Sequence, residues 1–524
     1  MVFVSTLGIL TVMAKKPLKI LLVAAEASPY AHVGGIGRVS AHLSRALMKL
    51  GHDVRIMMPR YGKIDLVKYP LEMVYTHLAV PTDNEKTPLL ICNVKAHQLP
   101  NAPLVYFLEN MEYYEKRANE YGYSDDPLRW ALLQRGTLEF LRRIQSSQDN
   151  GQWVSEKVGP WIPDVIHCND WQTGLLPQYL ATTYAADPLL SGIATIFTIH
   201  NMSFQGNFDH RFVSELDRDD GRSPIPGFFD KRLATVNAMR RGILFAQVVN
   251  TVSPTYAKEI LTEDYGEGLD QLLREVRAKV FGIINGIDYD EFNPKTDKLL
   301  KANYDHQSAA KRAANKSFLQ DRFNLEVTND RPLFAISSRL DEQKGLALVT
   351  STIDAILEET GAQLLVNGGG DQGYRTFFFN LASRFPKQVG VNLESDFQLP
   401  KQMFAGCDAI LIPSQFEPCG IVQMEAMRYG CIPIVRKTGG LADTVKDYNP
   451  SSRSGYGFVF EQYNPTAFTI AVARALALWH HQDLWQKLVQ KAMEQDFSWG
   501  ASAKAYSELY TRAQETKQQV VVNE

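Results

Sequence analysis

A turn that carries two basic side chains could receive a leaving anion. Residues 337–345 read SSRLDEQKG and place Arg339 and Lys344 five positions apart, directly after an apolar run. Arginine grips phosphate oxygens through two N–H groups, and lysine acts as a point charge. Both would favour cleavage of a sugar–diphosphate bond, because the released anion must be received by cations, backbone N–H groups or a metal. Taken alone, the turn is more typical of a solvated basic loop.

A second segment has the pattern of a strand, a tight turn and a helix. Residues 413–425 read PSQFEPCGIVQME, with the turn at EPCG and a helix predicted from Gly420 onward. The start of a helix presents free N–H groups to an anion. If Glu425 lies two turns into this helix, it faces the same cleft as Glu417. The alternative is an acidic helix start that only complements the helix dipole, but the strand–turn–helix context favours a binding function.

Two glycine-bearing turns could bring the backbone close to a ligand. Residues 32–39 (HVGGIGRV) lie between the first predicted strand and the first helix, where N–H groups could cradle phosphate or sugar. They lack both the GxGxxG spacing of dinucleotide sites and the lysine of P-loops. Residues 437–443 (KTGGLAD) follow another predicted strand, and their two glycines would allow close backbone approach. An ordinary strand–helix turn explains the second segment almost as well.

Polar and aromatic side chains follow two further predicted strands. Residues 167–171 read HCNDW and residues 200–206 read HNMSFQG. Polar groups beside an aromatic face suit a sugar ring, although either histidine alone is more typical of a buried structural residue. No metal site is predicted, because the DxD sequence Asp288-Tyr289-Asp290 falls in a turn-rich segment rather than after a core strand.

The elements that must position these turns alternate between strand and helix along the chain. Continuous apolar runs predict strands that are buried on both faces of a parallel sheet. The predicted strands span residues 19–25, 53–58, 164–168, 194–199, 248–252, 333–337, 363–367, 409–413 and 432–435, and the first helix spans residues 39–50. This rhythm is typical of parallel α/β architecture.

Two doubly wound, Rossmann-like domains are expected from this pattern. The 524 residues exceed what one hydrophobic core supports, and residues 285–294 (NGIDYDEFNP) form the best linker between two units. Ligands of such sheets bind beyond the carboxyl ends of the strands, so we expect the site in the cleft between the domains. A last helix, residues 501–517, is expected to pack back on the first domain.

Bulk composition argues against several other classes of function. A formal net charge of −3 disfavours nucleic-acid or membrane-surface binding through bulk charge. The five cysteines include no CxxC pair, which predicts neither a zinc site nor a disulfide framework and indicates a reducing cytosol. The apolar stretch at residues 2–13 follows no basic residue and is too short to span a bilayer, so we interpret it as a frayed or mis-started leader, with Met13 as an alternative start.

Eight segments, in order, resemble the bacterial glycogen synthase and plant starch synthase family, glycosyltransferase family 5. They are the first glycine loop, HCNDWQTGLLP, TIHNMSFQG, NTVSPTYAKEI, NGIDYDEFNP, SRLDEQKG, PSQFEPCGIVQMEAMRYG and RKTGGLADTV. The likeness runs from about Lys19 to Trp499. It implies two Rossmann-like domains facing across a cleft (GT-B architecture). It also implies metal-independent, retaining transfer of glucose from ADP-glucose to the non-reducing end of an α-1,4-glucan.

The resemblance implies a role for each candidate residue, and it implies no cofactor. The expected catalytic residues are Glu417 at the reacting centre, His200 at the donor glucose, and Arg339 and Lys344 at the leaving diphosphate. The expected nucleotide-sugar-binding residues are His32, Gly35, Arg339, Lys344, Cys419, Gly420, Ile421 and Glu425. The expected acceptor-binding and sugar-binding residues are Glu26, Asp170, Asn201 and Asn285.

Four positions depart from the family pattern. His32 and Arg38 stand where the family has a lysine that helps to bind the nucleotide sugar and an aspartate. By register, Ser395 replaces a tyrosine that packs on the base. Glu425 restores a second glutamate that is common in the wider retaining superfamily, where it contacts the ribose. These departures keep two alternatives open, namely another donor such as UDP-glucose or another acceptor on the same fold, and a weakly active glucan-binding regulatory homologue.

The expected partners are a nucleotide-sugar donor, ADP-glucose first, and an α-glucan acceptor, with no nucleic acid and no membrane. The expected compartment is the cytoplasm, or the plastid stroma for a plant-like source. We expect a leader at residues 1–18, an acceptor-side domain at 19–288, a nucleotide-sugar domain at 289–498 and a C-terminal helix at 499–524.

Overall fold

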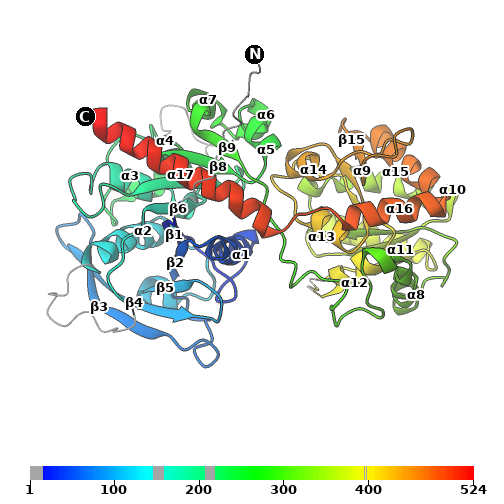
Figure 1. The fold of residues 1–524 in the computed structure, drawn as a ribbon, viewed down its shortest axis with the longest axis horizontal. Coiled ribbons are helices and arrows are strands. Elements are labelled where there is room, and N and C mark those ends of the chain that lie inside the picture. The colour runs from blue at the N-terminus through cyan, green and yellow to red at the C-terminus, as the bar shows by residue number, and fades with distance from the viewer. Residues whose placement is uncertain (1–15, 145–157, 207–218, 395, 397, 524) are drawn as a thin grey trace, which may run out of the picture.

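The chain folds into two α/β lobes, each built on its own sheet (Figure 1). The computed structural model describes residues 16–144, 158–206, 219–394, 396 and 398–523. Most of the expected leader therefore lies outside the described residues. The predicted fold class, two doubly wound α/β units facing each other, is confirmed.

The first lobe contains a nine-stranded sheet in the order β3-β4-β5-β2-β1-β6-β7-β8-β9. Its strands are β1 (Lys19–Val23), β2 (Asp53–Pro59), β3 (Glu72–Pro81), β4 (Leu89–Gln98), β5 (Leu104–Glu109), β6 (Val165–Asn169), β7 (Ala194–Ile199), β8 (Val248–Thr251) and β9 (Val280–Gly282). The pairs β3–β4 and β4–β5 are antiparallel and the other pairs are parallel. The prediction of uninterrupted strand–helix alternation is therefore wrong at residues 72–109. Exposed and buried side chains partly alternate along β3 and β4, so these strands lack the continuous apolar runs that marked the central ones.

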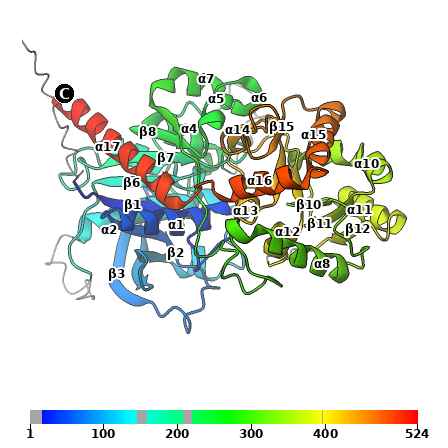
Figure 2. The ribbon, with the colours of Figure 1, turned by 45° about the vertical axis from the view of Figure 1, so that its right-hand side comes forward.

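Helices cover this sheet, and the last of them reaches it from the end of the chain (Figure 2). They are α1 (Gly35–Lys49), α2 (Asp126–Arg143), α3 (Leu176–Ala181), α4 (Ala238–Phe245), α5 (Pro254–Glu259), α6 (Glu263–Gly266), α7 (Asp270–Glu275) and α17 (Trp499–Asn523). Helix α1 begins at Gly35, four residues before the predicted start. Helix α17 adds Trp499, Tyr506 and Tyr510 to the core of the first lobe.

The second lobe contains a fully parallel sheet in the order β12-β11-β10-β13-β14-β15. Its strands are β10 (Leu333–Ser337), β11 (Gln363–Asn367), β12 (Val389–Asn392), β13 (Ala409–Ile412), β14 (Ile432–Arg436) and β15 (Phe458–Phe460). Its helices are α8 (Arg312–Arg322), α9 (Leu346–Thr350), α10 (Ile353–Thr360), α11 (Gln372–Arg384), α12 (Leu399–Gly406), α13 (Val422–Arg428), α14 (Gly439–Thr444), α15 (Pro465–Trp479) and α16 (Gln482–Met493). The strand order reverses between β10 and β13, and ligands of such sheets bind at that switch point.

Two segments cross between the lobes side by side. Ile287 pairs with Ser498 in a parallel bridge, and its N–H donates to the carbonyl of Phe497 at 2.8 Å. A small apolar cluster at this place brings together Val252 and Ile287 with Cys419 and Met424 of the second lobe. None of the helices in the described part of the chain is both long and apolar enough to cross a bilayer.

Candidate active site

The switch point of the second sheet holds an ion pair between Lys344 and Glu417. Lys344 Nζ lies 2.7 Å from Glu417 Oε2, and the Ser414 hydroxyl donates to the same oxygen at 3.1 Å. The two charged side chains are 18% and 12% exposed. Together with Gly420, they line a cavity of about 50 Å³ at the ends of β10 and β13. A charge-assisted pair that is this well shielded from water is stronger and better ordered than a surface pair.

The turn after β10 fits against the end of β13 because Gly345 has no side chain. Gly345 has a φ of +68°, and a Cβ added there would lie 1.9 Å from the Pro413 carbonyl oxygen. The Asp341 carboxylate accepts from the Lys344 N–H at 3.2 Å and fixes the start of this turn. The sequence therefore places Lys344 beside Glu417 through local turn chemistry rather than through a long element.

Arg339 lies on the same turn but is largely exposed. Its guanidinium contacts Asp341 at 3.1 Å and Gln343 at 3.2 Å, and its side chain is 66% exposed. An exposed ion pair of this kind is weak, so the Arg339 guanidinium can leave Asp341 and bind a more highly charged anion.

The helix after the EPCG turn begins later than predicted. Helix α13 starts at Val422, Gly420 has a φ of +65°, and Glu425 lies in the first turn rather than two turns in. The expected position of Glu425 two turns into the helix is therefore wrong, and Glu417 and Glu425 line two adjoining cavities. Ile421 lines both cavities. The cause is the left-handed Gly420, which delays the helix.

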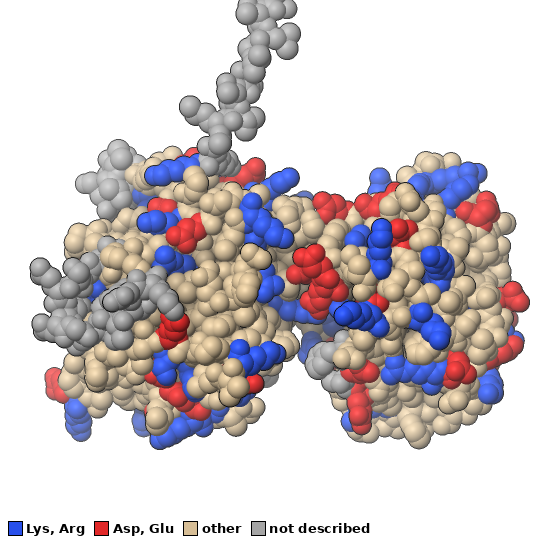
Figure 3. All heavy atoms as spheres, turned by 60° about the horizontal axis from the view of Figure 1, so that its bottom comes forward, with Lys and Arg blue, Asp and Glu red and all other residues tan. Residues whose placement is uncertain are grey.

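Glu425 lines a larger cavity between the lobes, of about 770 Å³. His32, Gly35 and Arg38 line its other side, and Figure 3 shows the two lobes meeting at a narrower waist that carries charges of both signs. Arg38 Nη1 lies 3.3 Å from Glu425 Oε1, and Nη2 lies 3.2 Å from Glu291 Oε1. Burial raises the pKa of Glu425 to about 7, and Arg38 opposes that shift. The charge of Arg38 is therefore paired with Glu425. Ser395, the other departure from the family pattern, lies outside the described residues.

In the first lobe, Asp170 follows β6 and His200 follows β7. Both lie near the point between β1 and β6 where the strand order of this sheet reverses. The Asp170 carboxylate accepts from the His200 N–H at 2.7 Å, and His200 Nε2 lies 3.0 Å from Asn169 Oδ1. Burial raises the pKa of Asp170 to about 7 and lowers the pKa of His200 to about 4. His200 is therefore a neutral hydrogen-bonding group at neutral pH. Asp170 has a φ of +55°, a left-handed conformation that strains a residue with a side chain.

Glu26 holds the glycine loop. Its Oε2 accepts from the N–H groups of Val33 at 2.5 Å and Gly34 at 3.2 Å, while Oε1 accepts from the Tyr121 hydroxyl. The side chain is buried. Loop and helix α1 are thereby fixed to the end of β1, and His32 is exposed at the loop's tip.

Asn201 and Asn285 occupy different surroundings. Asn201 Oδ1 accepts from the Ser203 N–H at 3.0 Å. Asn285 is buried on the crossing segment, and no described group donates to its Oδ1. Its backbone N–H bonds the Cys419 thiol. A buried amide oxygen without a donor is rare in proteins and is available to a ligand hydroxyl.

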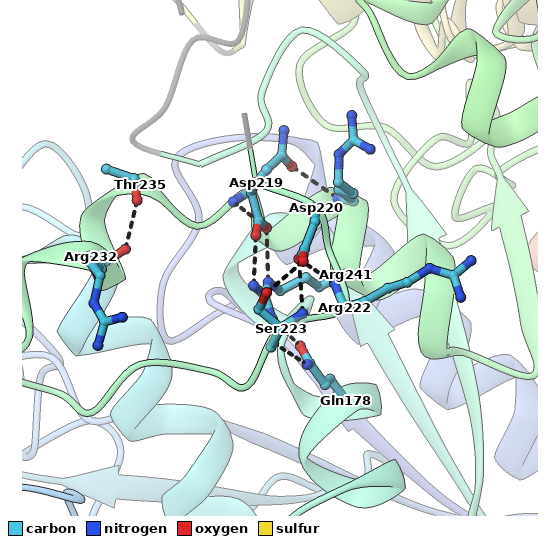
Figure 4. A network of polar contacts seen from close by, with 10 residues as sticks. Gln178, Asp219, Asp220, Arg222, Ser223, Arg232, Thr235 and Arg241 are labelled. Atoms are coloured by element: carbon cyan, nitrogen blue, oxygen red, sulfur yellow. Dashed lines mark hydrogen bonds and ion pairs between the residues drawn. The ribbon is translucent and has the colours of Figure 1, made fainter. Parts of the chain in front are cut away.

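A network of polar contacts is centred on Arg241 and Asp219 (Figure 4). Arg241 on α4 binds both oxygens of Asp219, at 2.9 and 2.7 Å, and also Gln178 Oε1 at 2.7 Å. Asp219 accepts from the N–H of Asn237, whose side chain donates to Gln205 at 2.7 Å. Gln205 belongs to the HNMSFQG segment, so the network helps to hold that segment in place.

Two other sequence candidates have structural partners. A Cβ added at Gly439 would lie 1.9 Å from the Glu417 carbonyl oxygen, so a glycine is needed here for the close approach of two backbone segments. Asp288 of the DxD sequence lies 2.8 Å from His42 Nδ1. Across the described ranges, no group of three or more His, Cys, Asp or Glu side chains is arranged to hold a metal ion.

Three residues of these groups were not predicted from the sequence. Ser414 supports Glu417, Tyr121 supports Glu26 and Asn169 orients His200. Ser414 and Asn169 lie inside the PSQFEPCG and HCNDW segments, so proximity to Glu417 and Asp170 could have indicated them. Tyr121 gives no comparable signal, because it lies in a loop far from Glu26 in the sequence.

Asp170 gives a pH-dependent prediction. Its pKa of about 7 in the folded protein exceeds its ordinary value of 3.8, so the folded state holds the proton more tightly than the unfolded chain. The stability contributed by this difference is fully present below the unfolded pKa of 3.8, and it is lost as the pH rises through the folded pKa of about 7. The melting temperature of Asp170→Asn, relative to that of wild type, should therefore rise as the pH increases from about 4 to about 7. A difference in melting temperature that does not change with pH would contradict this.

Two family models match the chain. The model for the starch synthase catalytic domain matches residues 19–275, and the model for glycosyl transferases group 1 matches residues 317–495.

Relatives and solved structures match nearly the whole chain. The glycogen synthase of Moorella thermoacetica is 39% identical, over 96% of this chain and 98% of its own. The glycogen synthase of Thermotoga maritima is 37% identical, over 95% and 99%. The catalytic domain of starch synthase IV from Arabidopsis thaliana, solved bound to ADP and acarbose, superimposes with a TM-score of 0.79 at 32% identity, over 95% of this chain and 100% of that one. A sucrose-phosphate synthase from Thermosynechococcus elongatus shares the fold, with a TM-score of 0.55 at 17% identity.

Proposed function

The chain belongs to the family of glycogen and starch synthases, and from that membership we propose that it transfers glucose from ADP-glucose to the non-reducing end of an α-1,4-glucan, with retained configuration. The observation that carries this proposal is the shielded Lys344–Glu417 pair at the switch point of the second sheet. At this point the Lys344 ammonium group can bind a leaving diphosphate, and the Glu417 carboxylate lies beside it.

We propose that the donor binds on the second lobe. Lys344 and Arg339 receive the diphosphate, and the backbone of Cys419, Gly420 and Ile421 holds sugar hydroxyls and phosphate. When the bond from the glucose C1 to phosphate breaks, its electron pair goes to the diphosphate oxygen. The two cations stabilise that charge as it forms. Glu417 supports the positive charge that develops at C1.

The nucleoside end of the donor extends toward the larger cavity between the lobes. His32, Gly35 and Glu425 line this cavity, and Glu425 is the proposed ribose contact. The ADP in the related starch synthase IV structure supports adenine as the base.

We propose that the glucan acceptor binds on the first lobe. Asp170, Asn201 and the neutral His200 supply hydrogen-bonding groups where β6 and β7 end, and Glu26 fixes the glycine loop beside them. Asn285 adds a buried carbonyl oxygen from the crossing segment. The acceptor 4-OH attacks C1 as the bond to the diphosphate breaks, forms the new C–O bond and passes its proton to the released diphosphate. We further propose the domain division 19–288 and 289–498, with the C-terminal helix returning to the first domain.

Glu425→Ala should raise the KM for the donor about tenfold while kcat changes little, because one charge-assisted hydrogen bond is lost in ground state and transition state alike. Steady-state kinetics at saturating glycogen measures this. Glu291→Ala is the matched control, since it removes the other carboxylate that Arg38 binds in the same cavity and leaves the proposed ribose contact at Glu425 in place. An unchanged donor KM in Glu425→Ala would refute the ribose role.

Incubation with ADP-, UDP- or GDP-glucose and a glycogen primer tests the proposal. ADP-glucose should give nucleotide release together with chain extension. Release only with another donor or acceptor would instead support a different transferase on the same fold, for which the replacement of the family's lysine by His32 is the specific reason. Glucan binding without turnover of any donor would support a regulatory homologue.

A further inference from the structure

Glu259, on the first lobe, binds the backbone at the start of α14 on the second lobe. It is the last residue of α5, and its two carboxylate oxygens accept from the Gly439 N–H at 3.0 and 3.1 Å. The Thr438 hydroxyl donates to the same carboxylate at 3.1 Å. A carboxylate that binds two groups of a facing lobe is an ordered contact rather than a loose surface one.

The next peptide group along the chain binds the backbone of Glu417. The Gly440 N–H donates to the carbonyl oxygens of Glu417 at 3.1 Å and Pro418 at 3.2 Å. Consecutive N–H groups therefore connect Glu259 on one lobe with the turn that carries Glu417 on the other.

This connection leaves no room for side chains. A Cβ at Gly439 would lie 1.9 Å from the Glu417 carbonyl oxygen, and one at Gly440 would lie 1.7 Å from the Cys419 carbonyl oxygen. The turn and the start of α14 are thus in direct backbone contact. A shift of one must move the other, because a packed interior transmits displacement.

A second contact between the same two helices provides a natural comparison. Asp443 on α14 accepts from the Ser253 hydroxyl at 2.5 Å, from the Thr255 N–H at 3.0 Å and from the Thr255 hydroxyl at 2.6 Å. Asp443 joins the lobes as Glu259 does, but its contacts lie away from the peptide groups that bind Glu417.

We propose that Glu259 is a positioning residue for Glu417, which places the catalytic turn of one lobe from the other. The proposal rests on the proposed role of Glu417. Glu259 fixes Gly439, Gly440 then fixes the Glu417 carbonyl, and the Glu417 carboxylate is held at Lys344. Misplacement of a reacting group by about 1 Å is enough to lower a rate by about 100-fold.

Steady-state kinetics of Glu259→Ala, Glu259→Gln and Asp443→Ala test this. Glu259→Ala should lower kcat by about 30-fold with the donor KM within about threefold of wild type. Glu259→Gln should recover part of the loss, because its amide oxygen still accepts from Gly439. Asp443→Ala should cost less than about fivefold. Equal losses of kcat in Glu259→Ala and Asp443→Ala would show that both residues act only by holding the two lobes together, and this would overturn the proposal.

A double variant and a second readout separate this relay from other effects. In a Glu417→Gln background, Glu259→Ala should have almost no further effect, and an undiminished 30-fold loss would overturn the relay. Amide hydrogen exchange followed by mass spectrometry needs no turnover. Exchange at Gly440 should rise in Glu259→Ala more than in Asp443→Ala, and equal protection would refute the proposal. Failure of the proposed function would show differently, as a wild-type protein that transfers no glucose from ADP-glucose.

Discussion

Lys344→Ala is expected to lower kcat by about 1,000-fold while the protein stays folded. Loss of one preorganised group that stabilises developing charge typically costs a factor of 100 to 1,000, roughly 3–4 kcal/mol. Here we expect the upper end of this range, because Glu417 Oε2 would remain without the cation that lies 2.7 Å from it. An unpaired carboxylate beside the diphosphate repels the leaving group that the lysine should receive.

Two controls accompany this variant. Lys344→Arg keeps the charge and should recover part of the rate, although the guanidinium differs in shape from the ammonium group. Lys437→Ala removes a lysine of the same lobe that is 55% exposed and paired with Glu461, and it should leave kcat unchanged. Melting temperatures show whether each variant folds. A Lys344→Ala enzyme with kcat within about tenfold of wild type would contradict the assignment.

Glu417→Gln is expected to lower kcat by about 100-fold, and Glu417→Ala by more, because both remove the charge that supports C1 and Ala also removes the acceptor for Ser414. The donor KM should change much less than kcat, since the carboxylate acts chiefly in the transition state. Single-turnover measurements with saturating donor and primer separate this chemical effect from product release.

The Lys344 and Glu417 effects should not be additive. The two groups form one pair, so the double alanine variant should be little slower than the slower single variant. Ser414→Ala should have a smaller effect, because it removes a neutral hydrogen bond to the same oxygen. Fully additive losses at Lys344 and Glu417 would mean that the two side chains act independently.

Residues that lie close in sequence to a strand end are the ones that sequence patterns locate. Lys344 and Glu417 each follow a buried apolar strand, and parallel strands bring their carboxyl ends to one edge. The apolar runs do not predict that β10 and β13 are neighbours, because strand order depends on tertiary packing. The antiparallel strands β3 and β4 were missed for the related reason that their partly exposed faces break the apolar run.

Contacts between the lobes were beyond the reach of sequence patterns. Arg38 departs from the family pattern, but its pairing with Glu425, 387 residues away, depends on how the lobes dock. Glu259 lies in the segment NTVSPTYAKEI, yet nothing local distinguishes it from a solvated helix end. The late start of α13 follows from the positive φ of Gly420, which glycine permits but does not require.

Analysis of the new linkage tests the central claim most directly. A maltooligosaccharide primer is incubated with wild-type protein and ADP-glucose labelled with carbon-13 at C1, and the product is examined by NMR. The proposed function predicts that the labelled glucose appears at the non-reducing end of the primer in an α-1,4 linkage, with stoichiometric release of ADP. A β linkage, a different linkage position, or free labelled glucose with no extension of the primer would contradict it.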